Sequence, residues 1–89
     1  MQKHDKGTLS ELICTKELVL EGYDVFWPVA DRGPVDIIAI HPATGNIRLI
    51  DVKTLSRRTK DGSKIYRTPS TLQKKIGVEI IEIDLSEDM

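Results

Sequence analysis

Hydrophobic and polar residues follow a helical spacing at the start of this chain. Apolar positions recur at intervals of three and four residues, which is typical of a helix with one buried face. They are Leu9, Leu12, Ile13, Val19 and Leu20. Thr8 and Glu11 have the spacing of a capping box, and Gly22 suits the left-handed residue that follows a helix. The pattern therefore predicts a helix over residues 8–21.

Later segments have the composition of strands. Runs rich in Val, Ile and aromatic residues, bounded by Gly and Pro, predict strands. These runs cover residues 23–29, 35–40, 46–54 and 78–85. Pro28 places the first of them at a sheet edge, and a turn through Pro42 and Gly45 joins the second to the third. The polar stretch 55–63 predicts a loop, and the following KIYRT is compatible with a short strand.

A second, shorter helix is predicted before the last strand. Thr68 is its expected cap, Pro69 its first residue and Gly77 its end. The resulting order αβββαβ predicts an α/β (α+β) fold in which helices flank a mixed sheet. Residues 1–89 are expected to form a single domain with a core over about 7–85 and a frayed tail at 86–89.

The second and third strands carry acidic residues within apolar runs. If a four-residue loop joins them, opposed residue numbers sum to 87, so Asp36 faces Asp51 and Ile38 faces Leu49. Directly opposed Cβ atoms lie about 4.5–5.5 Å apart, and like charges there are destabilising. A shared proton or a cation relieves that repulsion, and Mg²⁺ prefers carboxylate oxygens. Lys53 shares the face of Asp51, a combination that suits phosphoryl chemistry.

A second register remains open from the spacing. A two-residue turn at Thr44 and Gly45 would make opposed numbers sum to 89 and place Asp36 against Lys53. That pairing is an ordinary cross-strand salt bridge without a functional role. It would place Pro42 inside a paired strand, which is unfavourable because proline cannot donate to the ladder.

Length and composition favour a small intracellular protein. A chain of 89 residues buries a modest fraction of its surface, so we expect either a partner subunit or an unusually economical core. No apolar run reaches 18 residues and the first residues lack an apolar segment, so neither a membrane span nor a signal peptide is expected. The single cysteine, Cys14, fits a reducing, cytoplasmic compartment and lies in the apolar stripe of the first helix.

Charge is distributed unevenly along a chain whose net charge is −1. Residues 53–75 contain eight basic residues and one acidic residue. The basic residues are Lys53, Arg57, Arg58, Lys60, Lys64, Arg67, Lys74 and Lys75. This stretch is either a solvated loop or a strip that faces a polyanion.

These motifs together resemble the PD-(D/E)XK nuclease superfamily. The signature is an acid at the start of one strand and an acid, any residue and lysine on the next, here Val35-Asp36 and Asp51-Val52-Lys53. Valine stands where the nominal motif has proline. The element order also matches. Glu11 resembles the first-helix glutamate of members similar to archaeal Holliday-junction resolvases and to a cyanobacterial intron homing endonuclease. The resemblance spans about residues 7–84.

The resemblance implies a role for each matching residue. Asp36 and Asp51 would bind Mg²⁺, for which Mn²⁺ would substitute, with help from the backbone carbonyl of Val52. Lys53 would orient the attacking water. Glu11 would complete the acidic cluster, although its position after Thr8 also fits a purely capping role.

The implied function is a metal-dependent endodeoxyribonuclease that acts on DNA, including junction or branched DNA. A homodimer or higher homo-oligomer is expected, through the Pro28 region or the first helix. The expected DNA contacts are Arg57, Arg58, Lys60, Lys64, Arg67, Gln73, Lys74 and Lys75. Gln73 resembles a glutamine near the site of some relatives, and its alternative is an ordinary surface position. The rival functions are an inactive nucleic-acid-binding module of the same fold and a small structural or interaction protein.

Overall fold

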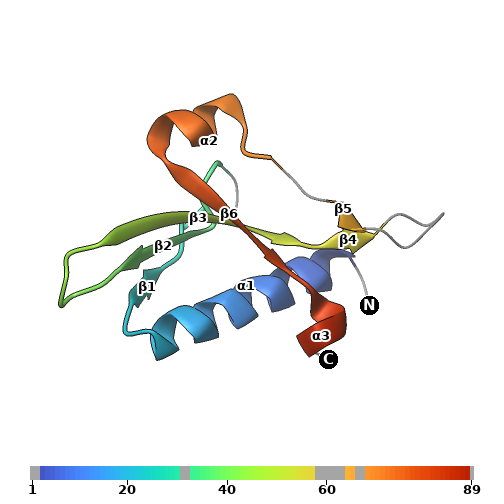
Figure 1. The fold of residues 1–89 in the computed structure, drawn as a ribbon, viewed down its shortest axis with the longest axis horizontal. Helices are drawn as coiled ribbons and strands as arrows, with labels where there is room; N and C mark the ends of the chain where they lie inside the picture. The colour runs from blue at the N-terminus through green and yellow to red at the C-terminus, as the bar shows by residue number, and fades with distance from the viewer. Residues whose placement is uncertain (1–2, 31–32, 58–63, 66–67, 89) are drawn as a thin grey trace.

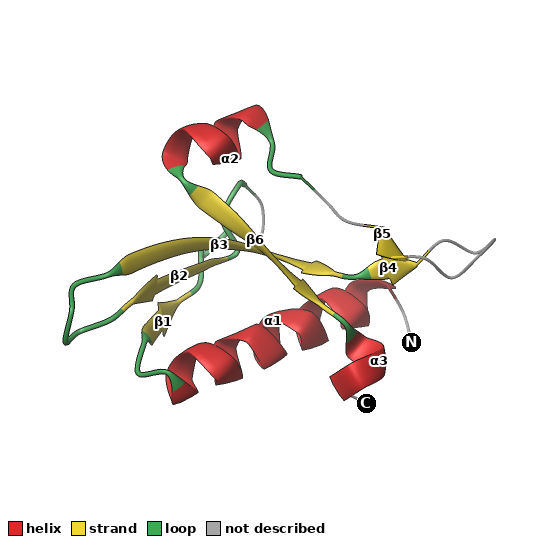
Figure 2. Cartoon of the chain, in the orientation of Figure 1, coloured by secondary structure: helices red, strands yellow, loops and turns green. Residues whose placement is uncertain are grey.

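The computed structural model describes residues 3–30, 33–57, 64–65 and 68–88 (Figure 1). The elements, drawn by type in Figure 2, are α1 (Lys3–Leu20), β1 (Asp24–Phe26), β2 (Ile37–Ile40), β3 (Ile47–Thr54), β4 (Ser56–Arg57), β5 (Lys64–Ile65), α2 (Thr71–Ile76), β6 (Val78–Ile83) and α3 (Leu85–Asp88). The predicted order αβββαβ is present. The β4–β5 pair lies within it, and α3 follows where the sequence predicts an irregular tail.

Four strands form one mixed sheet in the order β1-β2-β3-β6. β2 pairs antiparallel with both β1 and β3, whereas β3 and β6 are parallel. In Figure 1, α1 lies below the sheet and α2 above it. None of the helices in the described ranges combines the length and apolar character that a membrane span requires.

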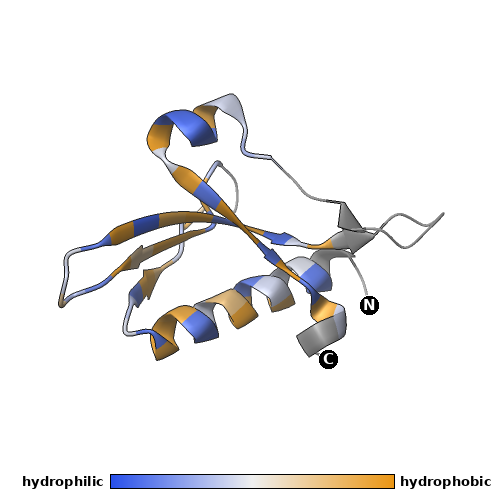
Figure 3. Ribbon diagram, viewed as in Figure 1, coloured by the Kyte–Doolittle hydropathy of each residue, from blue (hydrophilic) through white to orange (hydrophobic). Residues whose placement is uncertain are grey.

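The hydrophobic core lies between α1 and one face of the sheet. Figure 3 shows hydrophobic residues along both α1 and the strands it packs against. Cys14 and Leu18 of α1 are packed with Ile37, Ile50 and Val52 of the sheet, and the prediction that Cys14 is buried is confirmed. The predicted apolar face of α1 is only partly right, because Leu12, Val19 and Leu20 are exposed. Burial raises the pKa of the Cys14 thiol to about 11. Because side chains alternate along a strand, the residues between these core positions point to the opposite face.

The hairpin register matches the four-residue turn. Ile38 pairs with Leu49 and Ile40 with Ile47. His41 closes the turn, since its N–H donates to the Asn46 carbonyl at 2.9 Å. The register that would place Asp36 opposite Lys53 is therefore wrong for this chain.

The first helix begins five residues earlier than its sequence predicts, at Lys3. Thr8 consequently lies inside α1 and does not cap it. Contacts with a distant strand hold the early turns in place. The Ser10 and Thr54 hydroxyl oxygens are 2.7 Å apart, and the Thr54 hydroxyl also donates to the Lys6 carbonyl at 3.3 Å. The predicted start was wrong because these contacts join residues far apart in the sequence.

The end of α1 agrees with its prediction. Gly22 has φ +96°. Its N–H donates to the Val19 carbonyl at 3.0 Å, and the Tyr23 N–H donates to the Leu18 carbonyl at 3.0 Å. This pair of hydrogen bonds is the closure expected at a left-handed glycine that ends a helix.

The second helix starts at Thr71, with Ser70 as its N-cap in place of the predicted Thr68. The Ser70 hydroxyl accepts the Gln73 N–H at 3.2 Å, and the Ser70 N–H donates to Gln73 Oε1 at 2.9 Å. This reciprocal capping box satisfies two backbone donors and sets the helix start. Gly77, with φ +79°, ends the helix as predicted.

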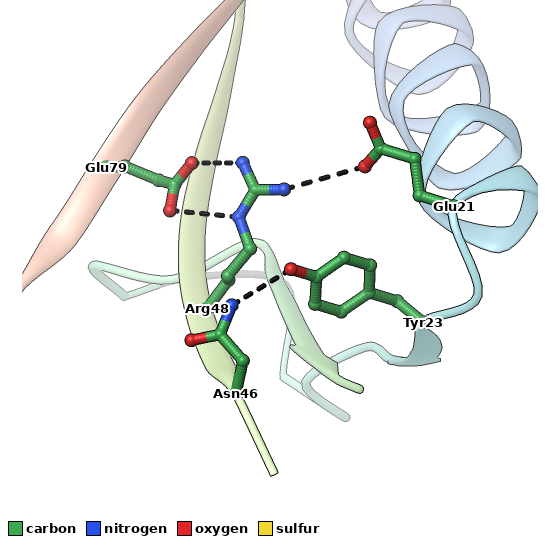
Figure 4. A network of polar contacts seen from close by, with 5 residues as sticks. All are labelled: Glu21, Tyr23, Asn46, Arg48 and Glu79. Atoms are coloured by element: carbon green, nitrogen blue, oxygen red, sulfur yellow. Dashed lines mark hydrogen bonds and ion pairs between the residues drawn. The ribbon is translucent and has the colours of Figure 1, made fainter. Parts of the chain in front are cut away.

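Arg48 joins several elements on the α1 side of the sheet (Figure 4). Its guanidinium donates twice to the Glu79 carboxylate on β6, with Nε 3.2 Å from Oε2, and one nitrogen lies 3.8 Å from Glu21 Oε2. The guanidinium carbon is 5.5 Å from the centre of the Tyr23 ring, and the Tyr23 hydroxyl accepts Asn46 Nδ2 at 2.9 Å. These contacts hold the residues that follow α1, Glu21 and Tyr23, against β3 and join β3 to β6.

Two glycine substitutions test the bounds of α1. Gly22→Ala places a Cβ at positive φ and 3.1 Å from His41 Nε2, so it should lower the free energy of unfolding by about 1–2 kcal/mol. Gly7→Ala meets nothing within 4 Å inside a helix and should raise that free energy by about 0.5–1 kcal/mol. Urea denaturation measures both. An unchanged stability of Gly7→Ala would contradict a helix that begins at Lys3.

Candidate metal centre

Asp36 lies where β2 separates from β3. Its N–H donates to the Ile50 carbonyl at 2.8 Å, and its carboxylate Oδ2 accepts the Val52 N–H at 2.8 Å. The ladder of paired residues between β2 and β3 ends at Ile37, which pairs with Ile50. The Asp36 side chain therefore supplies an acceptor for β3 at the point where the strand ladder stops. This contact anchors the carboxylate beside the backbone of Val52.

Asp51 occupies a buried position on β3, with only 6% of its surface exposed. Its Oδ2 accepts a hydrogen bond from Gln73 Nε2 at 2.8 Å, and its Oδ1 lies 3.4 Å from Lys53 Nζ. Ile50 and Val52 face the core, so Asp51 and Lys53 lie on the face away from α1. A buried polar group needs hydrogen-bonding partners of this kind.

The two aspartates are neighbours, as the register predicts. Burial and a hydrogen bond with the Asp51 carboxyl group raise the pKa of Asp36 to about 6, against the opposing effect of the Val52 N–H. The negative charges of Asp51 and Glu11 raise this pKa further. A cation bound between two adjacent carboxylates would relieve their mutual repulsion.

Glu11 lies on α1 within electrostatic reach of Asp36. Its side chain is half-buried. Because α1 begins at Lys3, Glu11 is not part of a capping box with Thr8, and that explanation of the residue is wrong. The charge of Glu11 therefore belongs to the electrostatic surroundings of the aspartate pair.

Gln73 is buried beside the aspartates and is not an ordinary surface residue. Only 8% of its surface is exposed. Its Nε2 donates to Asp51 Oδ2 at 2.8 Å and to the Pro34 carbonyl at 3.0 Å. The sequence analysis did not single out Ser70 or Pro34. The Ser70–Gln73 spacing is a capping-box signal that would have located the helix start, whereas the Pro34 contact has no local signal.

The donor set fits a magnesium-like ion. Within the described ranges, no three His, Cys, Asp or Glu side chains form a group that could hold a metal ion. Mg²⁺ does not need such a cage, since it usually keeps several waters and binds one or two carboxylates together with substrate phosphates. Asp36 and Asp51 supply two carboxylates, with the Val52 backbone alongside. These residues would hold such an ion and leave positions for water and a phosphate.

An open cleft of about 640 Å³ gives access to the Asp51 side of the aspartate pair. Asp51, Lys53 and Gln73 line it together with Gly33 and Pro34. A substrate that entered it would therefore meet the Asp51 carboxylate and the Lys53 ammonium group.

The predicted basic contacts are only partly visible in the described chain. Lys74 and Lys75 are exposed in the last turn of α2, next to Gln73. The backbones of Arg57 and Lys64 pair in the β4–β5 ladder, which replaces part of the predicted loop. Arg58, Lys60 and Arg67 lie outside the described residues.

Comparisons of this chain with protein-family models, with curated proteins and with solved structures found no match.

The raised pKa of Asp36 predicts a specific pH dependence of stability in chelator. Because the pKa of Asp36 is raised, the folded state binds more protons than the unfolded state between about pH 4 and 6. The stabilising contribution of Asp36 to the free energy of unfolding is therefore present at low pH and is lost as the pH rises through 6. Asp36→Asn should thus gain stability relative to the wild type across this window. Urea denaturation at several pH values measures the difference, with Asp24→Asn on the exposed strand β1 as control. A difference that does not vary with pH would contradict the electrostatic account.

Proposed function

We propose that this chain is a metal-dependent endonuclease that hydrolyses phosphodiester bonds of DNA. The observation that carries the proposal is the aspartate pair. The Asp36 carboxylate accepts the N–H of Val52, the residue after Asp51, at 2.8 Å, and Lys53 Nζ lies 3.4 Å from Asp51 Oδ1. Two acids and a lysine beside an open cleft suit phosphoryl transfer better than they suit a structural role. The resemblance to the PD-(D/E)XK motif points to the same chemistry.

Each residue of the site has a defined task in this proposal. Asp36 and Asp51 would hold Mg²⁺ or Mn²⁺, with the Val52 carbonyl as a further ligand and Glu11 acting directly or through water. Such an ion would supply polarisation of the phosphate and a water of lowered pKa. Lys53 would orient the attacking water and stabilise the charge that develops on the phosphate.

Positive charge around the site favours a polyanionic substrate. Lys53 lines the cleft, and Lys74 and Lys75 are exposed on the helix that contacts it. Contacts of lysine and arginine with phosphates supply affinity that falls with added salt, but they do not read the base sequence. The DNA contacts expected from the sequence also include Arg57, Arg58, Lys60, Lys64 and Arg67.

The proposal includes the pairing of two chains. A single site cuts one strand, and an 89-residue chain buries a modest core. Exposed apolar side chains lie next to the edge strand, where Phe26 and Trp27 expose 51% and 56% of their surface. Leu12, Val19 and Leu20 are exposed on α1. Both regions supply apolar surface of the kind that symmetric homodimers bury.

One observation favours a second candidate function. The ion pair between Lys53 and Asp51 partly neutralises the acids without a metal. A chain that keeps this pair permanently would be a nucleic-acid-binding module that uses its basic residues alone.

A cleavage panel separates these functions. Branched, flapped, single-stranded and linear DNA are incubated with Mg²⁺, with Mn²⁺ and with chelator. The wild type should cut at least one substrate when a metal is present, and Asp36→Asn and Lys53→Met should each lose at least about 100-fold in rate because a ligand or a charge-stabilising group is gone. Asp24→Asn is the matched control and should cut as the wild type does.

The other outcomes identify the alternatives. Cleavage in chelator would contradict the metal mechanism. Salt-sensitive DNA binding without any cleavage would favour the binding module, and the absence of both would favour an interaction protein.

A further inference from the structure

We infer that Gln73 is a positioning residue that sets the distance and orientation of the two aspartates before the ion binds. This inference rests on the proposed metal site and changes the expected role of Gln73, which the sequence analysis placed among the DNA contacts. It is based on the hydrogen bonds of the buried Gln73 side-chain amide, whose nitrogen and oxygen both have partners within the protein.

The side-chain amide of Gln73 is fully engaged within the protein. Its nitrogen carries two protons, which go to Asp51 Oδ2 at 2.8 Å and to the Pro34 carbonyl at 3.0 Å. Its oxygen accepts the Ser70 N–H at 2.9 Å. The orientation of the amide is unambiguous, since both partners of the nitrogen are acceptors and the partner of the oxygen is a donor. A DNA contact through the nitrogen would require one of these hydrogen bonds to break.

These contacts connect the two segments that carry the acids. Asp51 lies on β3, and Pro34 lies two residues before Asp36 in the segment that leads into β2. One amide therefore joins the Asp51 carboxylate to the backbone that carries Asp36. The bridge through Gln73 therefore holds the Asp51 carboxylate at a set distance from the segment that carries Asp36.

The position of Gln73 is fixed by the helix that carries it. An isolated helix of six residues is unstable. The capping box uses the Gln73 side chain itself, so the same oxygen that begins α2 orients the amide toward Asp51. Hydrogen bonds that orient metal ligands from outside typically change metal affinity or activity by about 10- to 100-fold when they are removed.

The test replaces the amide and keeps the volume of the side chain, with Gln73→Met. Mn²⁺ alone is titrated into the protein by calorimetry, without DNA. We expect the dissociation constant for Mn²⁺ to rise by about 10- to 100-fold. In cleavage assays at saturating metal, we expect kcat to fall by a similar factor, while KM for DNA changes by less than about threefold because no DNA contact is lost.

Ser70→Ala is the control for a purely structural role. It removes the hydroxyl that caps α2 but leaves the Gln73 amide and its backbone partner in place. Its urea midpoint should fall, whereas its Mn²⁺ affinity should stay within about twofold of the wild type because the bridge is intact. Mn²⁺ binding that weakens in Ser70→Ala as much as in Gln73→Met would show that only helix stability matters, and would overturn the inference.

Two further outcomes keep this inference separate from the proposed function. Wild-type affinity for Mn²⁺ in Gln73→Met, or a raised KM with unchanged kcat, would overturn the positioning role while the nuclease proposal stands. A wild type that neither binds Mn²⁺ nor cuts DNA would overturn the proposed function. Exchange of the Gln73 side-chain amide protons, followed by NMR in metal-free protein, then decides whether the bridge exists. Slow exchange supports it, and rapid exchange overturns it.

Discussion

The close approach of two carboxylates is the constraint on which the rest of this structure depends. The arrangement costs free energy because adjacent negative charges repel and both groups are partly or largely buried. Each acid is held by a separate contact that compensates for this cost. The Val52 N–H holds Asp36, and Lys53 and Gln73 hold Asp51. The proposed metal site gives this costly arrangement a purpose, because a bound cation would relieve the repulsion between the two acids.

The hydrophobic core and the Asp51 side chain lie on opposite faces of one sheet. The core between α1 and the sheet, together with the ion-pair network around Arg48, fixes the strands relative to each other. Asp51 and Lys53 lie on the other face, where α2 closes the site through Gln73. Asp36 lies at the end of the β2–β3 ladder, where its carboxylate accepts the Val52 N–H.

The sequence predicts the aspartate pair because the relevant information is local. The length of the Pro42–Gly45 turn and the match of Ile38 with Leu49 set the register, and the register brings Asp36 to Asp51. Other features depend on tertiary contacts. The early start of α1 needs Thr54, and the contact of Gln73 with Pro34 exists only in the folded chain. Thr68 and Ser70 are both acceptable caps by residue type, so spacing from Gln73 was the only signal that separated them.

X-ray diffraction from a crystal soaked in Mn²⁺ is the sharpest test for a metal between the two aspartates, because the anomalous signal of the metal locates it without reference to activity. We expect one peak between Asp36 and Asp51, within about 2.0–2.6 Å of an oxygen of each carboxylate. Lys53 should remain beside the peak, and Gln73 should keep its hydrogen bond to Asp51. A structure that shows no metal there, with Lys53 still paired to Asp51 and the aspartates sharing a proton, would contradict the account.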